Sequence, residues 1–181
     1  MVGGANDVPD DLYVIHEDGC NFVRLPIAES EDGRWHTVVD VGLRPVEDAI
    51  LLVGRQPFSF HEFCYEITLM PLDGGEAIST MDREIARKWL PDGFAPVALE
   101  VIGACCRSLL LLLEPDYIYR ITFMPEPSEE ALEKHHFVTK VMESLGFCVL
   151  ADGTDPYLRK FWLMGAPGVD LPPHVEEDLS L

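Results

Sequence analysis

The chain has 181 residues, of which 48% are hydrophobic, and 32 acidic against 13 basic side chains give it a formal net charge of -19. The hydrophobic fraction is ordinary for a globular domain and excludes a disordered acidic polymer. The negative charge argues against direct binding to nucleic acid or to an anionic membrane surface, because phosphate contacts need clustered lysine and arginine. A basic protein partner is compatible with this negative charge.

Composition predicts three segments. Residues 1–11, with glycine, proline and aspartate, predict a flexible lead. Residues 12–165 predict a single α+β domain, since this length is typical of one domain. Residues 166–181 hold three prolines and an acidic group and predict an exposed arm.

Short runs enriched in β-branched and aromatic residues predict strands in the first part of the chain. Glycine, proline or acidic turns bound several of them, a pattern that favours an antiparallel meander. The predicted strands are Leu12–His16, Asn21–Ile27, Trp35–Val41, Ala49–Val53 and Phe63–Met70.

Two helices are predicted next. Residues 79–90 predict an amphipathic helix capped by Ser79 or Thr80. Residues 96–113 predict a second helix, apolar enough to be tested as a membrane span. Glu100 and Arg107 lie inside it, and each charge would cost about 2.5 to 3.5 kcal/mol at the membrane centre. We therefore interpret this segment as a buried core helix.

The C-terminal part has the clearest pattern. Residues 117–123 predict a strand, and Ser128 predicts the N-cap of a helix whose first turn is acidic. An apolar stripe from Ala131 to Leu145 follows, and Gly146 predicts the helix end. Residues 147–150 and 158–164 predict two strands joined by a turn-rich loop. The helix is long enough for a parallel crossover, so the chain predicts a mixed, mainly antiparallel sheet with packed helices.

Catalytic and metal-binding patterns are weak. The six histidines form no group with metal-ligand spacing, and no Gly-x-Ser-x-Gly motif occurs. Cys105 and Cys106 lie inside the apolar helix, where burial raises a thiol pKa and favours a packing role. The odd number of cysteines and the absence of a secretory signal pattern predict a cytoplasmic protein without disulfides.

The span from Tyr117 to Met164 resembles the C-terminal half of the GNAT acyltransferase superfamily, with a strand, a helix ending in Val141-Met142-Glu143-Ser144-Leu145-Gly146-Phe147, and a strand pair. The resemblance implies a GNAT-like scaffold. In that family a tyrosine protonates the departing thiolate of coenzyme A. Met142 stands at the tyrosine position and cannot donate this proton. The glycine pair in Leu72-Asp73-Gly74-Gly75-Glu76 brings two carboxylates to a loop that would have to hold pyrophosphate, so no cofactor is expected.

Acidic residues are concentrated at both ends of the chain. Residues 1 to 48 hold 11 acidic and 3 basic side chains, and residues 125 to 181 hold 11 and 4. We therefore predict a non-catalytic acidic binding factor of the inhibitor, immunity or antitoxin-like kind, which docks on a basic protein. The predicted partner-binding residues are Asp10, Asp11, Glu29, Glu31, Asp32, Glu176, Glu177 and Asp178.

Two other functions stay open. The alternative is a GNAT-type acyltransferase that uses acetyl coenzyme A, with His135, His136 or Tyr119 as proton donor. A weaker hypothesis is a subunit of a larger assembly, including a homo-oligomer. Its candidate contacts are Phe58, Phe60, Phe63, Phe161 and Trp162, although such residues are more often core.

Overall fold

The computed structural model describes residues 14–17, 19–30, 32–50, 57–80, 83–90, 92–173 and 175. Over these residues the chain forms a mostly antiparallel sheet of eight strands with three helices, so the predicted α+β class is confirmed. The strand order is β1-β2-β3-β4-β6-β8-β7, with β5 paired to β4. The chain divides into two compact units, Met1–Gly42 with Tyr65–Leu109 and Leu43–Cys64 with Leu110–Leu181.

The first unit holds the antiparallel hairpins. Strand β1 (Val14–Glu17) pairs with β2 (Cys20–Glu29) through a turn at Gly19, whose φ of 74° suits glycine. Strand β3 (Trp35–Ile50) follows, and β5 (Ile78–Thr80) pairs with β4 (Pro57–Pro71). Strands β3 and β4 are longer than predicted, and each contributes residues to both units.

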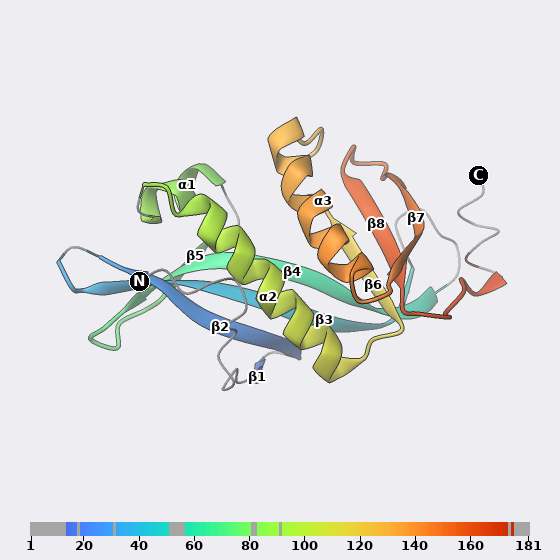
Figure 1. Cartoon of the computed structure of the whole chain (residues 1–181), viewed down its shortest axis with the longest axis horizontal. Helices are drawn as coiled ribbons and strands as arrows, with labels where there is room; N and C mark the ends of the chain where they lie inside the picture. Colours follow the sequence, from blue (N-terminus) through green and yellow to red (C-terminus); the bar gives the residue numbers. More distant parts are fainter. Residues whose placement is uncertain are drawn as a thin grey trace. The chain divides into compact units, whose positions relative to one another are not determined.

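Two helices belong wholly or mainly to this unit, the short α1 (Arg83–Trp89) and the long α2 (Ala95–Leu113). In Figure 1, α2 runs across one face of the strands of the unit. The prediction of a core helix is confirmed for one stripe of α2, whose buried hydrophobic residues are Ala98, Ile102, Cys105, Cys106, Leu109 and Leu110. By length and composition alone, residues 96–113 would also suffice to span a membrane.

The second unit is built around β6 (Tyr117–Ile121) and β8 (Lys160–Gly165). Strand β6 pairs in parallel with β4, and β8 lies antiparallel between β6 and β7 (Cys148–Thr154). Strands β6 and β7 therefore run in the same direction, as a crossover requires, but β8 separates them. Helix α3 (Glu129–Glu143) makes the connection and lies beside these strands in Figure 1.

Local signals place α3 as predicted. The Ser128 hydroxyl accepts a hydrogen bond from the Ala131 N–H at 3.3 Å, which confirms the N-cap. Gly146 follows the helix with a φ of 89°, which confirms the glycine stop. Val138 and Met142 of the apolar stripe are fully buried. Their burial fixes the face of α3 that meets the sheet.

Aromatic side chains fill the core of the second unit. Phe58, Phe60, Tyr119 and Phe161 are all below 10% exposed and form one cluster, on which Val175 also packs. Phe63 and Trp162 are also buried, at 7% and 8% exposed. The aromatic residues proposed as assembly contacts are therefore core residues, because their strands turn them inward.

Several predicted boundaries are wrong. Ser79 and Thr80 do not cap a helix, because they lie in β5 and pair with Thr68 and Ile67. Strand β7 continues to Thr154 through a bulge, where a loop was predicted. Within the predicted C-terminal arm, Leu171 and Val175 pack on the aromatic cluster, so this part is not freely exposed. The predicted strand at residues 49–53 falls mostly outside the described residues.

Candidate functional site

The turn between β2 and β3 displays two of the predicted partner-binding residues. The Ser30 hydroxyl and the Arg34 backbone N–H both donate to Asp32 Oδ1, at 2.7 and 3.1 Å. These hydrogen bonds, the Ser30 bond foremost, hold the pKa of Asp32 below its ordinary value of 3.8. Gly33 supplies the positive φ, 65°, that the turn needs. Asp32 is thus ionised and fixed in place.

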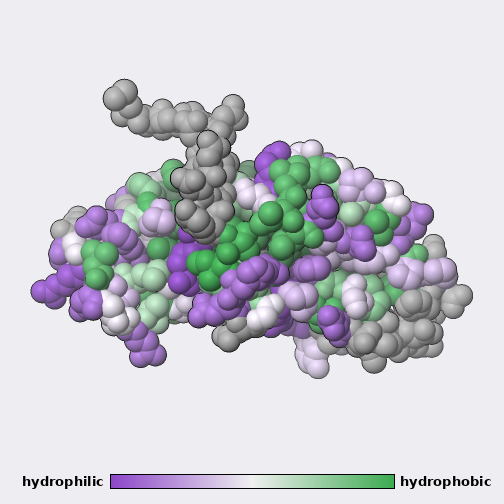
Figure 2. Space-filling view, turned by 90° about the horizontal axis from the view of Figure 1, so that it is seen from below, coloured by the Kyte–Doolittle hydropathy of each residue, from purple (hydrophilic) through white to green (hydrophobic). Residues whose placement is uncertain are grey.

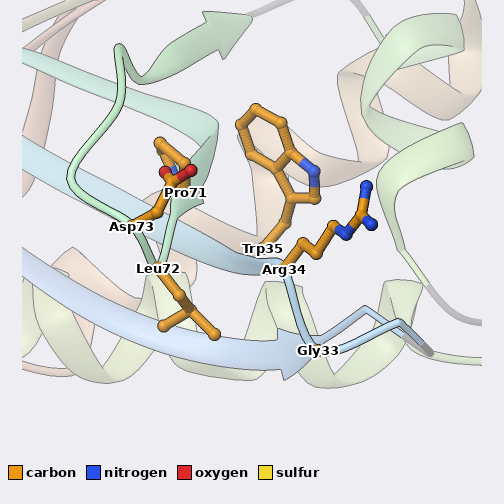
Figure 3. A pocket seen from close by; sticks show the side chains of 6 residues that line it. All are labelled: Gly33, Arg34, Trp35, Pro71, Leu72 and Asp73. Atoms are coloured by element: carbon orange, nitrogen blue, oxygen red, sulfur yellow. The ribbon is translucent and has the colours of Figure 1, made fainter.

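A hollow of about 470 Å³ lies beside this turn. The Leu72 N–H donates to the Arg34 carbonyl at 2.9 Å and joins the β2–β3 turn to the turn that follows β4. Figure 3 shows the Trp35 ring between the Arg34 side chain and the Pro71–Asp73 turn. We call this hollow, lined by Gly33, Arg34, Trp35, Pro71, Leu72 and Asp73, the turn pocket.

Three carboxylates lie at or beside the turn pocket, and we call them its acidic rim: Asp73 lines the pocket, and Glu29 and Asp32 lie next to Gly33. The side chains of Glu29 and Asp32 are 61% and 57% exposed, and Asp73 is also exposed. Arg34 is the cation among the described residues that line the pocket, and it lies 3.8 Å from Asp32. The Leu72 side chain is half exposed, at 52%. The turn pocket therefore offers apolar surface next to carboxylates that face water.

The other predicted partner-binding residues are not placed by the structure. They lie outside the described residues and comprise Asp10, Asp11, Glu31, Glu176, Glu177 and Asp178. Of the predicted set, only Glu29 and Asp32 can be related to a surface. Trp35, Leu72 and Asp73 were missed, since only the fold brings residues 33–35 next to residues 71–73.

A buried polar network lies elsewhere in the first unit. Arg24 donates to both carboxylate oxygens of Asp40, at 2.7 and 3.2 Å, and the Thr68 hydroxyl donates to Asp40 at 2.9 Å. Ser79 extends the network through a 2.9 Å bond to Thr68. The bond to Asp40 raises the pKa of Arg24. This network joins three strands and β5, so its role is structural.

Two of the three candidate proton donors, His135 and Tyr119, are poorly suited to acid catalysis. Burial lowers the pKa of His135 to about 3, with nearby Arg120 adding to the effect, so its imidazole is neutral at pH 7. Burial raises the pKa of Tyr119 to about 12, and its ring is part of the aromatic cluster. His136 is exposed and meets the Trp162 ring edge-on at 6.2 Å.

The loop that contains Gly74 and Gly75, which was predicted to bind phosphate poorly, holds a hydrogen bond between two of its own residues. The Gly75 N–H donates to the Asp73 carboxylate at 3.2 Å. A donor that a phosphate would need is therefore already bonded to a carboxylate.

Burial raises the pKa of Cys105 to about 12, as predicted for a packing thiol. The described residues contain no group of three or more ligand side chains arranged to hold a metal ion.

Two hydrogen-bonded loops expose a group of large hydrophobic side chains in the second unit. Phe123 and Leu158 were predicted in strands, but β6 ends at Ile121 and β8 begins at Lys160. The Glu126 N–H donates to the Leu158 carbonyl at 2.9 Å and holds the loops together. Exposed apolar groups are typical of contact surfaces. This group, the loop face, contains Phe123, Met124, Tyr157 and Leu158, each at least 52% exposed.

Hydrophobic side chains are not confined to the core in the space-filling view. Figure 2 shows hydrophobic side chains exposed on part of the surface seen from below. In α2, Leu111 and Leu112 are each 63% exposed.

Comparison with protein-family models, with curated proteins and with solved structures finds no match for this chain.

Proposed function

We propose that this protein is a non-catalytic acidic binding factor that docks on a basic protein partner through the turn pocket. The observation that carries the proposal is a hollow with Trp35 and Leu72 in its wall and exposed carboxylates on its rim. Apolar contacts of this kind supply affinity, and charges at the rim supply orientation and speed of association.

The physical argument has a local and a long-range part. Locally, the ordered β2–β3 turn presents Asp32 at little entropic cost, since its hydrogen bonds already fix the carboxylate. At long range, a net charge of -19 attracts a cation and raises the rate of encounter. Both effects weaken with salt, because counterions screen exposed charges.

The GNAT-type acyltransferase is our second candidate. The observation in its favour is the succession of strand, helix and antiparallel strand pair over residues 117–165. Against it stand the neutral His135, the buried Tyr119 and the fully buried Met142. Acetyl coenzyme A distinguishes the two candidates, because a ligand that binds the folded state raises the melting temperature.

The test of the binding proposal is capture of a partner by the wild type and by a variant carrying Glu29→Gln and Leu72→Ser. Both side chains are exposed, so the variant is expected to fold. We expect the wild type to retain a basic protein at about 50 mM salt and to release it at about 500 mM. The variant should retain much less of the same protein, and Glu143→Gln, which removes one charge on α3, should retain it fully.

Two results would contradict the binding proposal. One is capture of an acidic protein, or of a protein that stays bound at high salt. Binding would then not depend on attraction between opposite charges, which salt screens. The other is equal retention by the double variant and the wild type. A rise in melting temperature with acetyl coenzyme A, together with no captured basic protein, would favour the acyltransferase.

A further inference from the structure

A second hollow, of about 490 Å³, lies within the second unit, where β4 and β6 begin. The two strands pair in parallel at His61 with Ile118 and at Glu62 with Tyr119. Residues just before these pairs line the hollow, among them Phe58, Asp116 and Tyr117, together with Val46 and Glu47 from β3. None of these residues belongs to the turn pocket. We call this hollow the strand-start pocket.

Aromatic and aliphatic groups form one wall of the strand-start pocket. The rings of Phe58 and Tyr117 meet edge to face, with centroids 5.5 Å apart and planes at 78°. The Tyr117 hydroxyl donates to the Asp170 carbonyl at 2.8 Å, which fixes the orientation of its ring. Val46 and Pro172 also line the hollow. The wall therefore suits a short hydrocarbon chain, and its rings are held in place before any ligand binds.

The charged side chains among the described residues of the strand-start pocket are acidic. They are the exposed carboxylates Glu47 and Asp116, and no lysine or arginine is among the described residues that line the hollow. Burial lowers the pKa of His61, although Asp116 opposes the shift, so this imidazole is neutral at pH 7. Burial raises the pKa of Tyr117, and the negative charge of Asp116 adds to the effect. An anionic ligand would be repelled, and a neutral apolar one would leave the carboxylates without a counter-charge.

We propose that the strand-start pocket binds an alkylammonium group, with its hydrocarbon chain along the Phe58 and Tyr117 wall and its ammonium between Glu47 and Asp116. A long aliphatic stem with a charged end matches a hollow whose described lining combines aromatic and aliphatic side chains with two carboxylates. The ammonium comes either from a free alkylamine or from a lysine side chain of another protein. The proposal is independent of the proposed function, since the two use different units and different residues.

The test is a titration with n-pentylammonium chloride, followed through backbone amide chemical shifts of the full-length protein. We expect saturable shifts centred on Val46, Glu47, Ser59, His61 and Tyr117. Glu47→Gln and Asp116→Asn should each weaken binding by about fivefold or more, because each removes one exposed counter-charge. The matched control Glu143→Gln, also in this unit, should bind as the wild type does. All three side chains are exposed, and unchanged thermal unfolding would verify that the variants fold.

Two further ligands show whether binding depends on the positive charge or on the hydrocarbon chain alone, and they identify the source of the ammonium. Neutral n-pentanol has a similar chain and should bind much more weakly. A capped peptide with one lysine should bind, and the same peptide acetylated at that lysine should not. Tighter binding of the peptide than of the amine indicates a protein source, and the reverse indicates a small molecule. Absence of saturable shifts with both cations, equal binding of pentanol, or unchanged affinity in both variants would overturn the proposal.

Discussion

Arg120 is the largest fully buried side chain among the described residues, and polar oxygens and aromatic rings lie around its guanidinium. Its nitrogens donate to the Thr139 hydroxyl at 2.6 Å and to the His135 carbonyl at 2.9 Å. The rings of Phe63 and Trp162 each lie 5.6 Å from it. His135 stacks on Trp162 with centroids 5.1 Å apart. A buried cation disfavours a second positive charge close to it, because like charges repel each other.

This arrangement makes the stability of the fold depend on His135. Its pKa falls from 6.5 to about 3 on folding, mainly through burial and then through Arg120, His136 and Lys134. Between these two values the unfolded chain binds a proton that the folded chain does not. The free energy of unfolding must therefore decrease as the pH falls from about 6.5 towards 3, by up to about 1.4 kcal/mol per pH unit.

We predict that His135→Gln flattens this dependence, because glutamine does not titrate. Urea unfolding at pH 6.5 and pH 5, compared between variant and wild type, measures the change in slope. The control is Leu112→Ala, which changes an exposed side chain without a titratable group and should leave the slope as it is. An identical slope in the His135→Gln protein and the wild type would show that another group controls stability in this range.

Residues with strong local signals were predicted well, and those that depend on distant contacts were not. Ser128 and Gly146 were recognised because a cap and a glycine stop act within one turn of helix. The turn pocket could not be predicted, since Trp35 and Leu72 are far apart in the sequence. Its acidic rim was predicted only in part, through Glu29 and Asp32. Asp73 was noted for its charge, but its position beside Trp35 follows from the strand pairing alone.

At the scale of elements, α2 contains both fully buried and exposed leucines. Leu109 is fully buried, whereas Leu112, three residues further on, is 63% exposed. We predict that Leu109→Ala lowers the free energy of unfolding by about 3 kcal/mol, because it leaves a cavity. Leu112→Ala should change it by less than about 0.5 kcal/mol. Chemical denaturation of both variants measures the difference.

The same pair of positions tests the interpretation of α2 as a core helix. A helix that crosses a membrane would be damaged by a charge at either position. We expect Leu112→Asp to remain folded without lipid or detergent, since the side chain already meets water. Loss of the soluble folded protein in this variant would contradict the interpretation. Composition alone could not distinguish a core helix from a membrane-spanning helix, because an apolar helix of this length is compatible with both.

Strand lengths were predicted less well than the order of elements. β-branched and aromatic residues marked the centres of β3 and β4, but both strands extend beyond those centres. Phe123 and Leu158 show the opposite error. They have the composition of strand residues, yet they lie in turns, where the Thr122 hydroxyl bonds to the Met124 carbonyl and Leu158 has a φ of 63°. Turn geometry overrides β-propensity at these positions.

At the scale of the whole molecule, the two units are interleaved along the chain. The second unit combines residues 43–64 with residues 110–181. Its aromatic cluster needs Phe58 and Phe60 from the first of these segments as well as Tyr119 and Phe161 from the second. We predict that a fragment of residues 110–181 fails to fold by itself. Circular dichroism and amide chemical-shift dispersion would reveal this, with the full-length protein as the reference, and a well-dispersed fragment would contradict the prediction.

The three tryptophans are distributed unequally between the interleaved units, with Trp35 and Trp89 in the first and Trp162 in the second. Trp162 is 8% exposed and stacked on an imidazole, so its fluorescence is sensitive to the local environment. Replacing Trp35 and Trp89 by phenylalanine would leave an emission signal from the second unit only. Conversely, Trp162→Phe would leave signals from the first unit only. Red shifts that coincide in the two proteins during denaturation would mean that neither half of this fold melts without the other.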